Sequence, residues 1–498
     1  MVMPSSRLVD VFYSKFNKFL IKSGYVSLSQ DEFKSHVIKL LVVLAVIPSV
    51  VIFNRVYRFI GEDLLSMTLI PVIFIVTYPY LAVLNDFFRR RACLYDDLRF
   101  MLISSSIVAP TYDLIKMLLE SFKWSSIYRC IAVDSLRLKT FTKWLTIYDA
   151  LNMISEFSPS KKFKQALLDY LDSLRRGTVF LRLKEISKEL LNELINESKA
   201  FLNKSMSLLT LSTIVLGFVP SVVLSLELLL SERFMFMYMI FAILISAVLL
   251  IVFPERPYIL KISLDNEERI GKVVTYAFMA LLLFINSLVI TNFVSVNMKQ
   301  LILIDVSLLI PITVTRIRPF IMGFKEIKVI PSLILTIAEI LQQSTDVVSD
   351  LRRAFIKTKV PSLSRLGALN DVSELTNVLK YLKSWIARYA VLNIYLVLNA
   401  GINDRATLIK LRDVVNEFIS VYKEFLLSAL LPLMLSIFIP WFCLSMMYLT
   451  KTALSINYLL PIITLCVLYS VLASKFVFDD YVNPAFLVTS LMTVYMLI

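Results

Sequence analysis

Residues 425–448 read FLLSALLPLMLSIFIPWFCLSMMY, an apolar stretch without one Asp, Glu, Lys or Arg. A helix needs about 20 apolar residues to cross the roughly 30 Å hydrocarbon core of a bilayer, and this stretch supplies them. Lipid offers no partner for unpaired backbone groups, so a single segment of this kind crosses as a helix. The stretch therefore predicts a helical membrane protein.

The rest of the chain repeats this signal. Of its 498 residues, 58% are hydrophobic and 18% charged, and its mean hydropathy is +0.75. A soluble domain carries about 25% charged residues. We therefore expect an all-α polytopic membrane protein with about nine transmembrane helices, at Val37–Phe53, Leu64–Leu84, Ser205–Leu230, Phe234–Phe253, Val273–Val294, Gln300–Thr315, Phe425–Tyr448, Ala453–Ala473 and Val482–Ile498.

The basic residues are distributed unevenly between the two sides of these spans. If the N-terminus is inside, the inner segments hold 46 of the 52 Lys and Arg residues and the outer segments hold five, while Lys39 lies in the first span. Loops that stay in the cytoplasm are enriched in Lys and Arg. This asymmetry predicts a multi-pass protein of the cell (cytoplasmic) membrane, with the N-terminus cytoplasmic and the C-terminus outside.

Two of the inner segments are large enough to be domains. Their apolar residues recur at helical spacing, as in Phe163, Leu167, Tyr170 and Leu174, so we expect helical bundles. We divide the chain into a cytoplasmic N-terminal amphipathic segment (1–36), a transmembrane pair (37–84), a first cytoplasmic domain (85–204), four transmembrane helices (205–315), a second cytoplasmic domain (316–424) and three transmembrane helices (425–498).

The N-terminal segment contains an amphipathic stretch at 7–22, with Phe12, Phe16 and Phe19 among basic residues. Such a helix can lie on an anionic inner leaflet. It can equally pack against a cytoplasmic domain, and the sequence leaves both alternatives open.

The same order of elements occurs twice, which predicts two duplicated cytoplasmic helical bundles. Two spans, a domain and two spans are followed by the same series and one extra span. Within each copy, a glycine (Gly177 or Gly401) is followed by an amphipathic helix and then by a span that contains a proline (Pro220 or Pro440). Both copies enter the membrane in the same direction, so the repeat is parallel.

Residues that carry chemistry are scarce. The chain has eight glycines and one histidine, His36, and its four cysteines at 93, 130, 443 and 466 form no C-x-x-C pair. We expect the cysteines to pack in apolar surroundings and the acidic pairs Asp96-Asp97 and Asp479-Asp480 to be solvated. We therefore expect no catalytic residues, no cofactor and no metal site, and not an enzyme.

The duplicated architecture resembles the membrane platform proteins of type IV pilus, archaellum and type II secretion machines, known as the type II secretion system F-protein family. The resemblance covers residues 85–498 and is closest to the archaeal-type branch. Each domain would open with a helix pair, at Leu98–Ser106 and Pro110–Phe122, then at Pro331–Gln343 and Thr345–Ile356. Members usually have a glycine between the paired helices, and this chain has none there.

The resemblance implies a non-enzymatic role in filament assembly or protein secretion. Such a platform couples a cytoplasmic hexameric ATPase to the insertion of prepilin-like subunits into the filament. The implied partners are this ATPase, pilin-like filament subunits, membrane lipid and a second copy of the chain in a homodimer, and no nucleic acid.

Two sets of residues are candidate sites. Basic residues on the two domains could contact an acidic face of the ATPase: Lys161, Lys162, Lys164, Arg175, Arg176, Arg405, Lys410 and Arg412. Attraction to the inner leaflet would enrich the same residues without any partner. In the membrane, Asp305, Glu227, Pro220 and Pro440 are candidates for coupling to a filament subunit, since buried charges and kinked helices often mark function.

Two other functions remain as alternatives. A small-solute secondary transporter could be built on a parallel internal repeat, but it favours glycine-rich broken helices with buried charges. A membrane enzyme acting on lipid phosphates would need more acidic and basic groups in one site than the acidic pairs offer.

Overall fold

The computed structural model describes residues 5–24, 86–108, 113–226, 233–262, 297–343, 347–365, 371–402, 404–449, 456–480 and 483–498, with residues 277, 278, 281, 282 and 285. Over these residues the protein is almost entirely helical, and they contain no strand beyond one isolated bridge between Ile262 and Ser384. The expected all-α class is therefore confirmed for the described part of the chain. The chain divides into two compact units, Met1–Ser187 and Lys188–Ile498.

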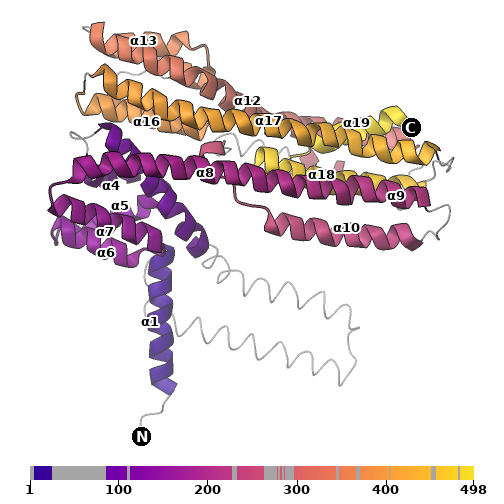
Figure 1. Ribbon diagram of the computed structural model, residues 1–498, viewed down its shortest axis with the longest axis horizontal. Helices are drawn as coiled ribbons and strands as arrows, with labels where there is room; N and C mark the ends of the chain where they lie inside the picture. The colour runs from indigo at the N-terminus through magenta and orange to yellow at the C-terminus, as the bar shows by residue number, and fades with distance from the viewer. Residues whose placement is uncertain are drawn as a thin grey trace. The chain divides into compact units, whose positions relative to one another are not determined.

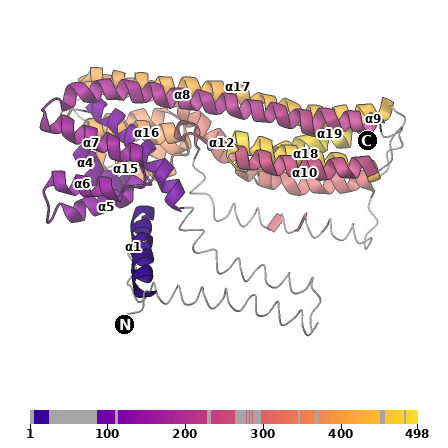
Figure 2. The ribbon, with the colours of Figure 1, turned by 60° about the horizontal axis from the view of Figure 1, so that its bottom comes forward.

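The first unit is a bundle of short helices (Figure 1). It consists of α1 (Ser5–Ser23), an unlabelled helix of residues 86–108, α4 (Leu114–Glu120), the 3₁₀ turn η1 (Ser121–Trp124), α5 (Ile131–Phe141), α6 (Ile147–Phe157), α7 (Lys161–Arg175) and the beginning of α8 (Val179–Thr213). In Figure 2 the helices α4 to α7 gather in one cluster.

The helices of this bundle bury their apolar faces in its interior, and α7 is an example. Phe163, Leu167, Tyr170 and Leu171 of α7 are buried, as their spacing predicts. The helix begins one residue after Ser160, whose hydroxyl accepts the amide of Phe163, so Ser160 is the N-cap. The dipeptide Ser158-Pro159 predicts an N-cap at Ser158 with Pro159 at the first helical position, and this prediction is wrong.

The helix of residues 86–108 is fastened to the beginning of α5 in two ways. Cys93 forms a disulfide with Cys130, the N-cap residue of α5. One turn after Cys93, the buried carboxylate of Asp97 accepts the amides of Cys130 (2.9 Å) and Ile131 (3.2 Å). A negative charge is favoured at this end of a helix, where the first amides lack helical partners. The expectation that the cysteines only pack is therefore wrong for Cys93 and Cys130, whereas Cys443 and Cys466 are free and buried. The expectation that Asp97 is solvated is also wrong.

The C-terminal end of α1 packs against the same helices. Leu20 is buried, and the ring of Phe19 stacks on Phe87 at 4.6 Å between centroids. The guanidinium groups of Arg90 and Arg137 donate to the last carbonyls of α1, those of Lys22 and Ile21. Of the two alternatives for the N-terminal segment, packing on a domain is therefore realised at this end.

The second unit contains long helices and short connecting ones. Its elements are the rest of α8, the π-helical segment η2 (Ile214–Phe218), α9 (Val219–Leu226), α10 (Arg233–Val252), η3 (Tyr258–Leu260), α12 (Met298–Gln343), α13 (Val347–Lys357), α14 (Pro361–Ser364), η5 (Val372–Glu374), α15 (Leu375–Val378), η6 (Leu379–Tyr381), α16 (Trp385–Asn399), α17 (Arg405–Leu449), α18 (Ile456–Phe478) and α19 (Ala485–Leu497). In Figures 1 and 2, α9, α10, α17, α18 and α19 run side by side.

Four helices among the described residues are long and apolar enough to cross a membrane: Val179–Val223, Lys299–Gln343, Arg405–Met446 and Pro461–Phe478. Two shorter apolar helices are Tyr238–Val252 and Ala485–Leu497. Six of the nine expected spans thus have helical counterparts, of which α19, at about 20 Å, is too short for a 30 Å core. Val37–Phe53, Leu64–Leu84 and most of Val273–Val294 lie outside the described residues.

The helix α12 is longer than the sequence pattern predicts. It runs for 46 residues from Met298 to Gln343 and contains Pro311, Pro319 and Pro331. The helix therefore continues past Thr315, where we expect the span to end, and the expectation that a new helix opens at Pro331 is wrong. A proline removes one helical hydrogen bond and bends a helix, but it does not have to end it.

The helix α16 is surrounded by protein. Every residue from Trp385 to Val397 is buried, and the helix packs against α12, α17, α15 and η5. Its first residues are held by Glu326 of α12, a fully buried carboxylate. Glu326 accepts the amides of Lys383 (2.9 Å) and Ser384 (2.8 Å), the N-cap residue, and the hydroxyl of Ser362. Glu326 and Asp97 thus play the same role, each accepting the amide of an N-cap residue.

We predict that Glu326→Ala destabilises the second unit by about 2–4 kcal/mol, because it leaves two buried amides and a hydroxyl without an acceptor. The matched control is Glu339→Ala on the same helix, where the side chain is exposed and the expected change is within about 0.5 kcal/mol. Thermal unfolding of the detergent-solubilised protein measures both. Equal effects of the two substitutions would contradict this role of Glu326.

Candidate functional site

Two glycine turns of the same type precede the two long helices. After α7, the amide of Gly177 donates to the carbonyl of Leu174, and the amide of Thr178 donates to that of Ser173. This pair of bonds is a Schellman motif, which requires a left-handed residue after the cap. Gly177 supplies it with φ +68°. The chain then reverses directly into α8.

The turn after α16 has the same hydrogen bonds. The amide of Gly401 donates to the carbonyl of Leu398 and that of Ile402 to Val397, with φ +67° at the glycine. The helix that follows, α17, is 45 residues long. The sequence-derived repeat therefore has a local structural counterpart at each glycine, whereas the helices that precede the glycines differ in burial.

The end of the first unit at Gly177 is basic and partly apolar. Arg175 and Arg176 are exposed. Phe180 and Leu181 of α8, just beyond the turn, are 55% and 69% exposed. We call these four residues the Gly177 tip. Exposed large apolar side chains inside a charged rim are typical of protein-binding surfaces.

The three lysines of the first unit are separate from this tip. Lys161, Lys162 and Lys164 are exposed in the first turn of α7, and Arg175 is in its last turn. At 1.5 Å per residue the two groups are about 16–21 Å apart. The structure therefore does not bring the five basic residues into one cluster.

The helix α7 between these ends is fixed to the unit. The hydroxyl of Tyr170 donates to the carboxylate of Asp113, the residue that precedes α4. Burial raises the pKa of Tyr170, and this hydrogen bond raises it further. The phenol therefore stays protonated and retains its donor role at physiological pH.

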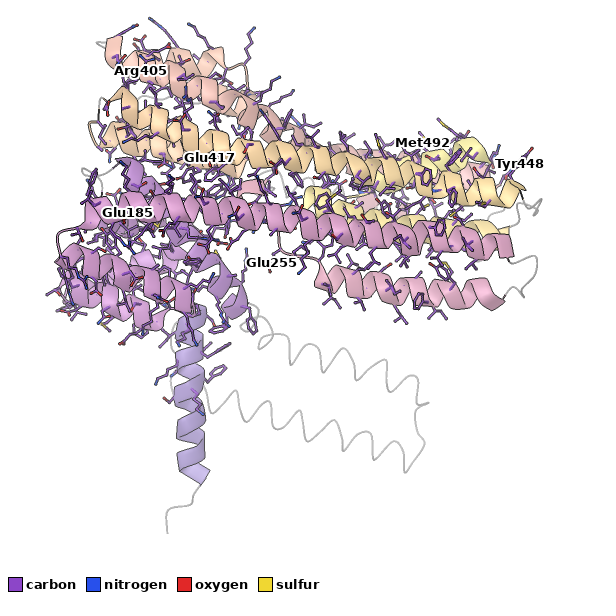
Figure 3. All side chains as sticks on the ribbon, viewed as in Figure 1. Glu185, Glu255, Arg405, Glu417, Tyr448 and Met492 are labelled. Carbon is purple, nitrogen blue, oxygen red and sulfur yellow. A yellow bond between two sulfur atoms is a disulfide. The ribbon has the colours of Figure 1, made fainter. Side chains whose placement is uncertain are left out.

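The basic residues of the second repeat lie in the first turns of α17, but not on one face. Arg405 and Lys410 are exposed, and Arg412 pairs with Asp413 at 2.8 Å. Arg405 and Arg412 are seven residues apart and share a side, whereas Lys410 points about 140° away from Arg405. Figure 3 shows Arg405 and Tyr448 at opposite ends of the helix. The first turns of α17, residues 405–412, have no exposed apolar pair like that of the Gly177 tip.

Inside the apolar part, the two proline-containing helices meet. Pro220 and Pro440 are both buried. Next to them, a Cβ added to Gly217 of η2 would lie 3.0 Å from Cγ1 of Ile439, so any larger residue requires the side chain of Ile439 to shift. The structure thus packs the segment just before Pro220 against the part of α17 just before Pro440, which the sequence could not establish.

The π-helical segment η2 leads into Pro220, which lacks an amide and so disrupts the hydrogen-bond pattern before it. Neighbouring side chains use the carbonyls of this segment. The hydroxyl of Tyr238 from α10 donates to Val215, and that of Ser221 donates to Gly217 at 2.6 Å. Ser221 also lies 3.3 Å from the sulfur of Cys443 on α17. Non-α-helical segments of this kind occur often at functional sites.

Pro440 creates a second contact between helices. Because proline has no amide, the carbonyl of Ser436 lacks its helical partner. The hydroxyl of Ser490 on α19 donates to this carbonyl at 2.7 Å. A hydroxyl–hydroxyl contact between Ser436 and Thr489, also 2.7 Å, lies beside it. The proline therefore locks α17 to α19.

The structure describes one of the two acidic candidates. Asp305 lies two turns into α12 and is half-buried. Glu227 lies outside the described residues. The structure therefore gives no geometry for a role of Glu227 in coupling.

Several polar residues have structural roles that sequence reasoning missed. Asp96 pairs with Arg99, Asp479 pairs with Lys475 at 2.6 Å, and Asp480 pairs with Arg316 at 2.9 Å. The expectation that the acidic pairs are solvated is therefore wrong for buried Asp97, whereas Asp96, Asp479 and Asp480 are partly exposed and ion-paired. For two of these carboxylates the sequence did contain a signal of ion pairing. Arg99 lies three residues after Asp96, and Lys475 lies four residues before Asp479, so each pair shares a helix face.

Arg256, which follows α10 in the chain, is buried. Its guanidinium donates to the carbonyl of Phe476 at the end of α18 and lies 4.8 Å from the ring centroid of Phe425. Burial lowers its pKa, while nearby Asp479 opposes this effect. A cation at a helix C-terminus is stabilised by the terminal carbonyls.

Comparison of the chain with models of known protein families, with curated proteins and with solved structures finds no match.

We predict that Gly177→Ala and Gly401→Ala each destabilise the protein by about 1 kcal/mol, because alanine is strained at positive φ. Nothing lies within 4 Å of the added methyl group at either position, so the cost is conformational. Asparagine tolerates this conformation better, and Gly177→Asn should recover part of the loss. Thermal unfolding midpoints provide the measurement, and no change for either alanine variant would contradict the assignment.

We predict that Ser490→Ala costs about 0.5–1.5 kcal/mol in the wild type and less in a Pro440→Ala background. The alanine at 440 restores the amide that pairs with Ser436, so the hydroxyl of Ser490 is no longer needed. A double-mutant cycle on unfolding in detergent measures this coupling. Additive effects of the two substitutions would be inconsistent with the proposed lock. Ser445→Ala is the control, since that hydroxyl bonds within its own helix.

Proposed function

We propose that this protein is the membrane platform of a type IV pilus-like filament machine, of the pilus, archaellum or type II secretion kind. In this role it couples a cytoplasmic hexameric ATPase to the insertion of prepilin-like subunits. The observation that carries the proposal is the pair of identical glycine turns, each of which opens a helix that is long enough to cross a membrane and continue beyond it.

The lengths of these helices support a mechanical role. Val179–Val223 and Arg405–Met446 are 45 and 42 residues long, or about 65 Å each. About 30 Å of this length crosses the hydrocarbon core. A continuous helix transmits a displacement at one end to the other end, so movement at a glycine turn would reach the membrane.

The contact at the prolines supports coupling in the membrane. A movement of η2 against α17 would act directly on the close approach of Gly217 to Ile439. The side chains around it that reach freed carbonyls are small hydroxyls and one tyrosine, which offer no path for an ion. This site is suited to a change in packing.

The Gly177 tip is the surface that we assign to the ATPase. Its two arginines favour an acidic partner face, and Phe180 and Leu181 supply apolar area. Charge mainly sets the association rate and the specificity, whereas buried apolar anchors supply most of the affinity. The corresponding surface after Gly401 has charge without such anchors, so we expect it to contribute less.

We predict that Arg175→Glu/Arg176→Glu reduces co-purification of the ATPase by about tenfold or more without changing membrane insertion. The matched control, Lys161→Glu/Lys164→Glu, changes the net charge equally at the other end of α7. Affinity purification of the full-length membrane protein from cells that express the ATPase measures both. Undiminished recovery with the arginine variant would falsify the assignment of the tip, and equal losses in both variants would indicate a non-specific charge effect.

Deletion of the protein tests the broader role. Loss of surface filaments or of secreted protein on deletion, restored by the wild type and not by the arginine variant, is the expected result. Normal filaments and secretion, combined with loss of uptake of a solute, would instead favour the transporter.

A further inference from the structure

The disulfide of the first unit belongs to a row of cross-links between the helix of residues 86–108 and α5. Arg90 lies three residues before Cys93, and Asp134 lies four residues after Cys130. Residues three and four apart on a helix lie on one face. Arg90 and Asp134 form a buried ion pair at 2.6 Å, one turn from the disulfide on each helix. Asp97, one turn away on the other side, accepts the amide of Cys130.

The same ion pair holds α1. Arg90 donates to the carbonyl of Lys22, and Arg137, which also pairs with Asp134 at 3.5 Å, donates to that of Ile21 at 2.9 Å. Gly24 permits this approach, since a Cβ there would lie 2.9 Å from the guanidinium of Arg90. The attachment of α1 therefore depends on the position of Asp134 relative to Arg90, which the disulfide fixes.

The two cysteine residues differ in exposure. Cys93 is 7% exposed, whereas Cys130 is half-buried at the beginning of α5. We therefore expect a reductant in solution to attack the disulfide at Cys130. Disulfides in the cytoplasm of most organisms are transient, catalytic or redox-sensing. The redox-sensing interpretation requires the first unit to lie in the cytoplasm, and this placement rests on the proposed function.

We propose that Cys93 and Cys130 form a reversible redox site that takes a dithiol reductant of the thioredoxin class, and that opening it releases α1 from the first unit. A thiolate of the reductant attacks Cys130 Sγ, the S–S bond breaks, and Cys93 leaves as a thiolate that takes up a proton. The second thiol of the reductant then attacks the mixed disulfide and releases Cys130. The protein gains two electrons and two protons, and the reductant becomes a disulfide.

A thiol count tests the closed state. Cells are quenched with acid, and the denatured full-length protein is labelled with a polyethylene glycol maleimide. Cys443 and Cys466 are free, so two labels are expected without reductant and four with it. The variant Cys443→Ser/Cys466→Ser should take up no label without reductant and two labels with it. Four labels without reductant would overturn the proposal. So would zinc retained by the purified protein, because Asp97 and the two sulfur atoms are also close enough to hold a metal ion.

Hydrogen exchange tests the release of α1. Reduction of the purified protein with dithiothreitol should accelerate amide exchange over residues 5–23 by about tenfold or more, and reoxidation should reverse it. Cys93→Ser/Cys130→Ser should exchange fast without reductant, and Asp134→Asn should do so in both redox states. The proposal would be overturned if reduction raises the thiol count of the wild type from two to four but leaves the rate of amide exchange over residues 5–23 unchanged. Neither measurement involves the ATPase, so failure here leaves the platform role unaffected.

Discussion

The long helices of the second unit exceed the thickness of a membrane, and this excess length determines how the unit is packed. A bilayer core of about 30 Å covers about 20 residues of a helix, yet α12 and α17 have 46 and 45 residues. The remaining turns of each helix must pack outside the lipid. α16 packs against both helices and α13 packs against α12, and the buried carboxylate of Glu326 fixes where α16 begins. The apolar and polar parts of the unit are therefore built on the same helices.

Prolines in these helices place a second constraint on the packing. Each removes a backbone amide and leaves a carbonyl that an apolar environment cannot satisfy. The protein answers with side-chain hydroxyls from neighbouring helices, as Ser490 does for Ser436 and Tyr238 does for Val215. Helix contacts in this region are thus specified by hydrogen bonds as well as by shape, which apolar side chains packed among lipid tails would specify poorly.

Sequence patterns predicted the features that depend on local rules. The apolar stretches, the amphipathic face of α7 and the two glycine turns depend on spacing and on the backbone freedom of one residue. Features that depend on distant pairing were not predictable. The Cys93–Cys130 disulfide, the caps formed by Asp97 and Glu326, and the contact of Gly217 with Ile439 join residues between 33 and 222 positions apart. The uninterrupted helix through Pro331 was missed because proline is a weak stop signal when packing on both sides sustains the helix.

The burial of α16 has a consequence for how the chain is made. Its sequence, WIARYAVLNIYLVLN, is apolar on every side, and one of the helices that cover it, α17, follows it in the chain. While the ribosome is still synthesising α17, α16 has lost contact with the ribosome but has no partner on that side. At 15 residues it is too short to span the bilayer, and Arg388 within it opposes insertion. Biogenesis of the protein therefore includes an interval in which this helix must be shielded from aggregation, and a chaperone or the insertion machinery has to cover it until α17 arrives.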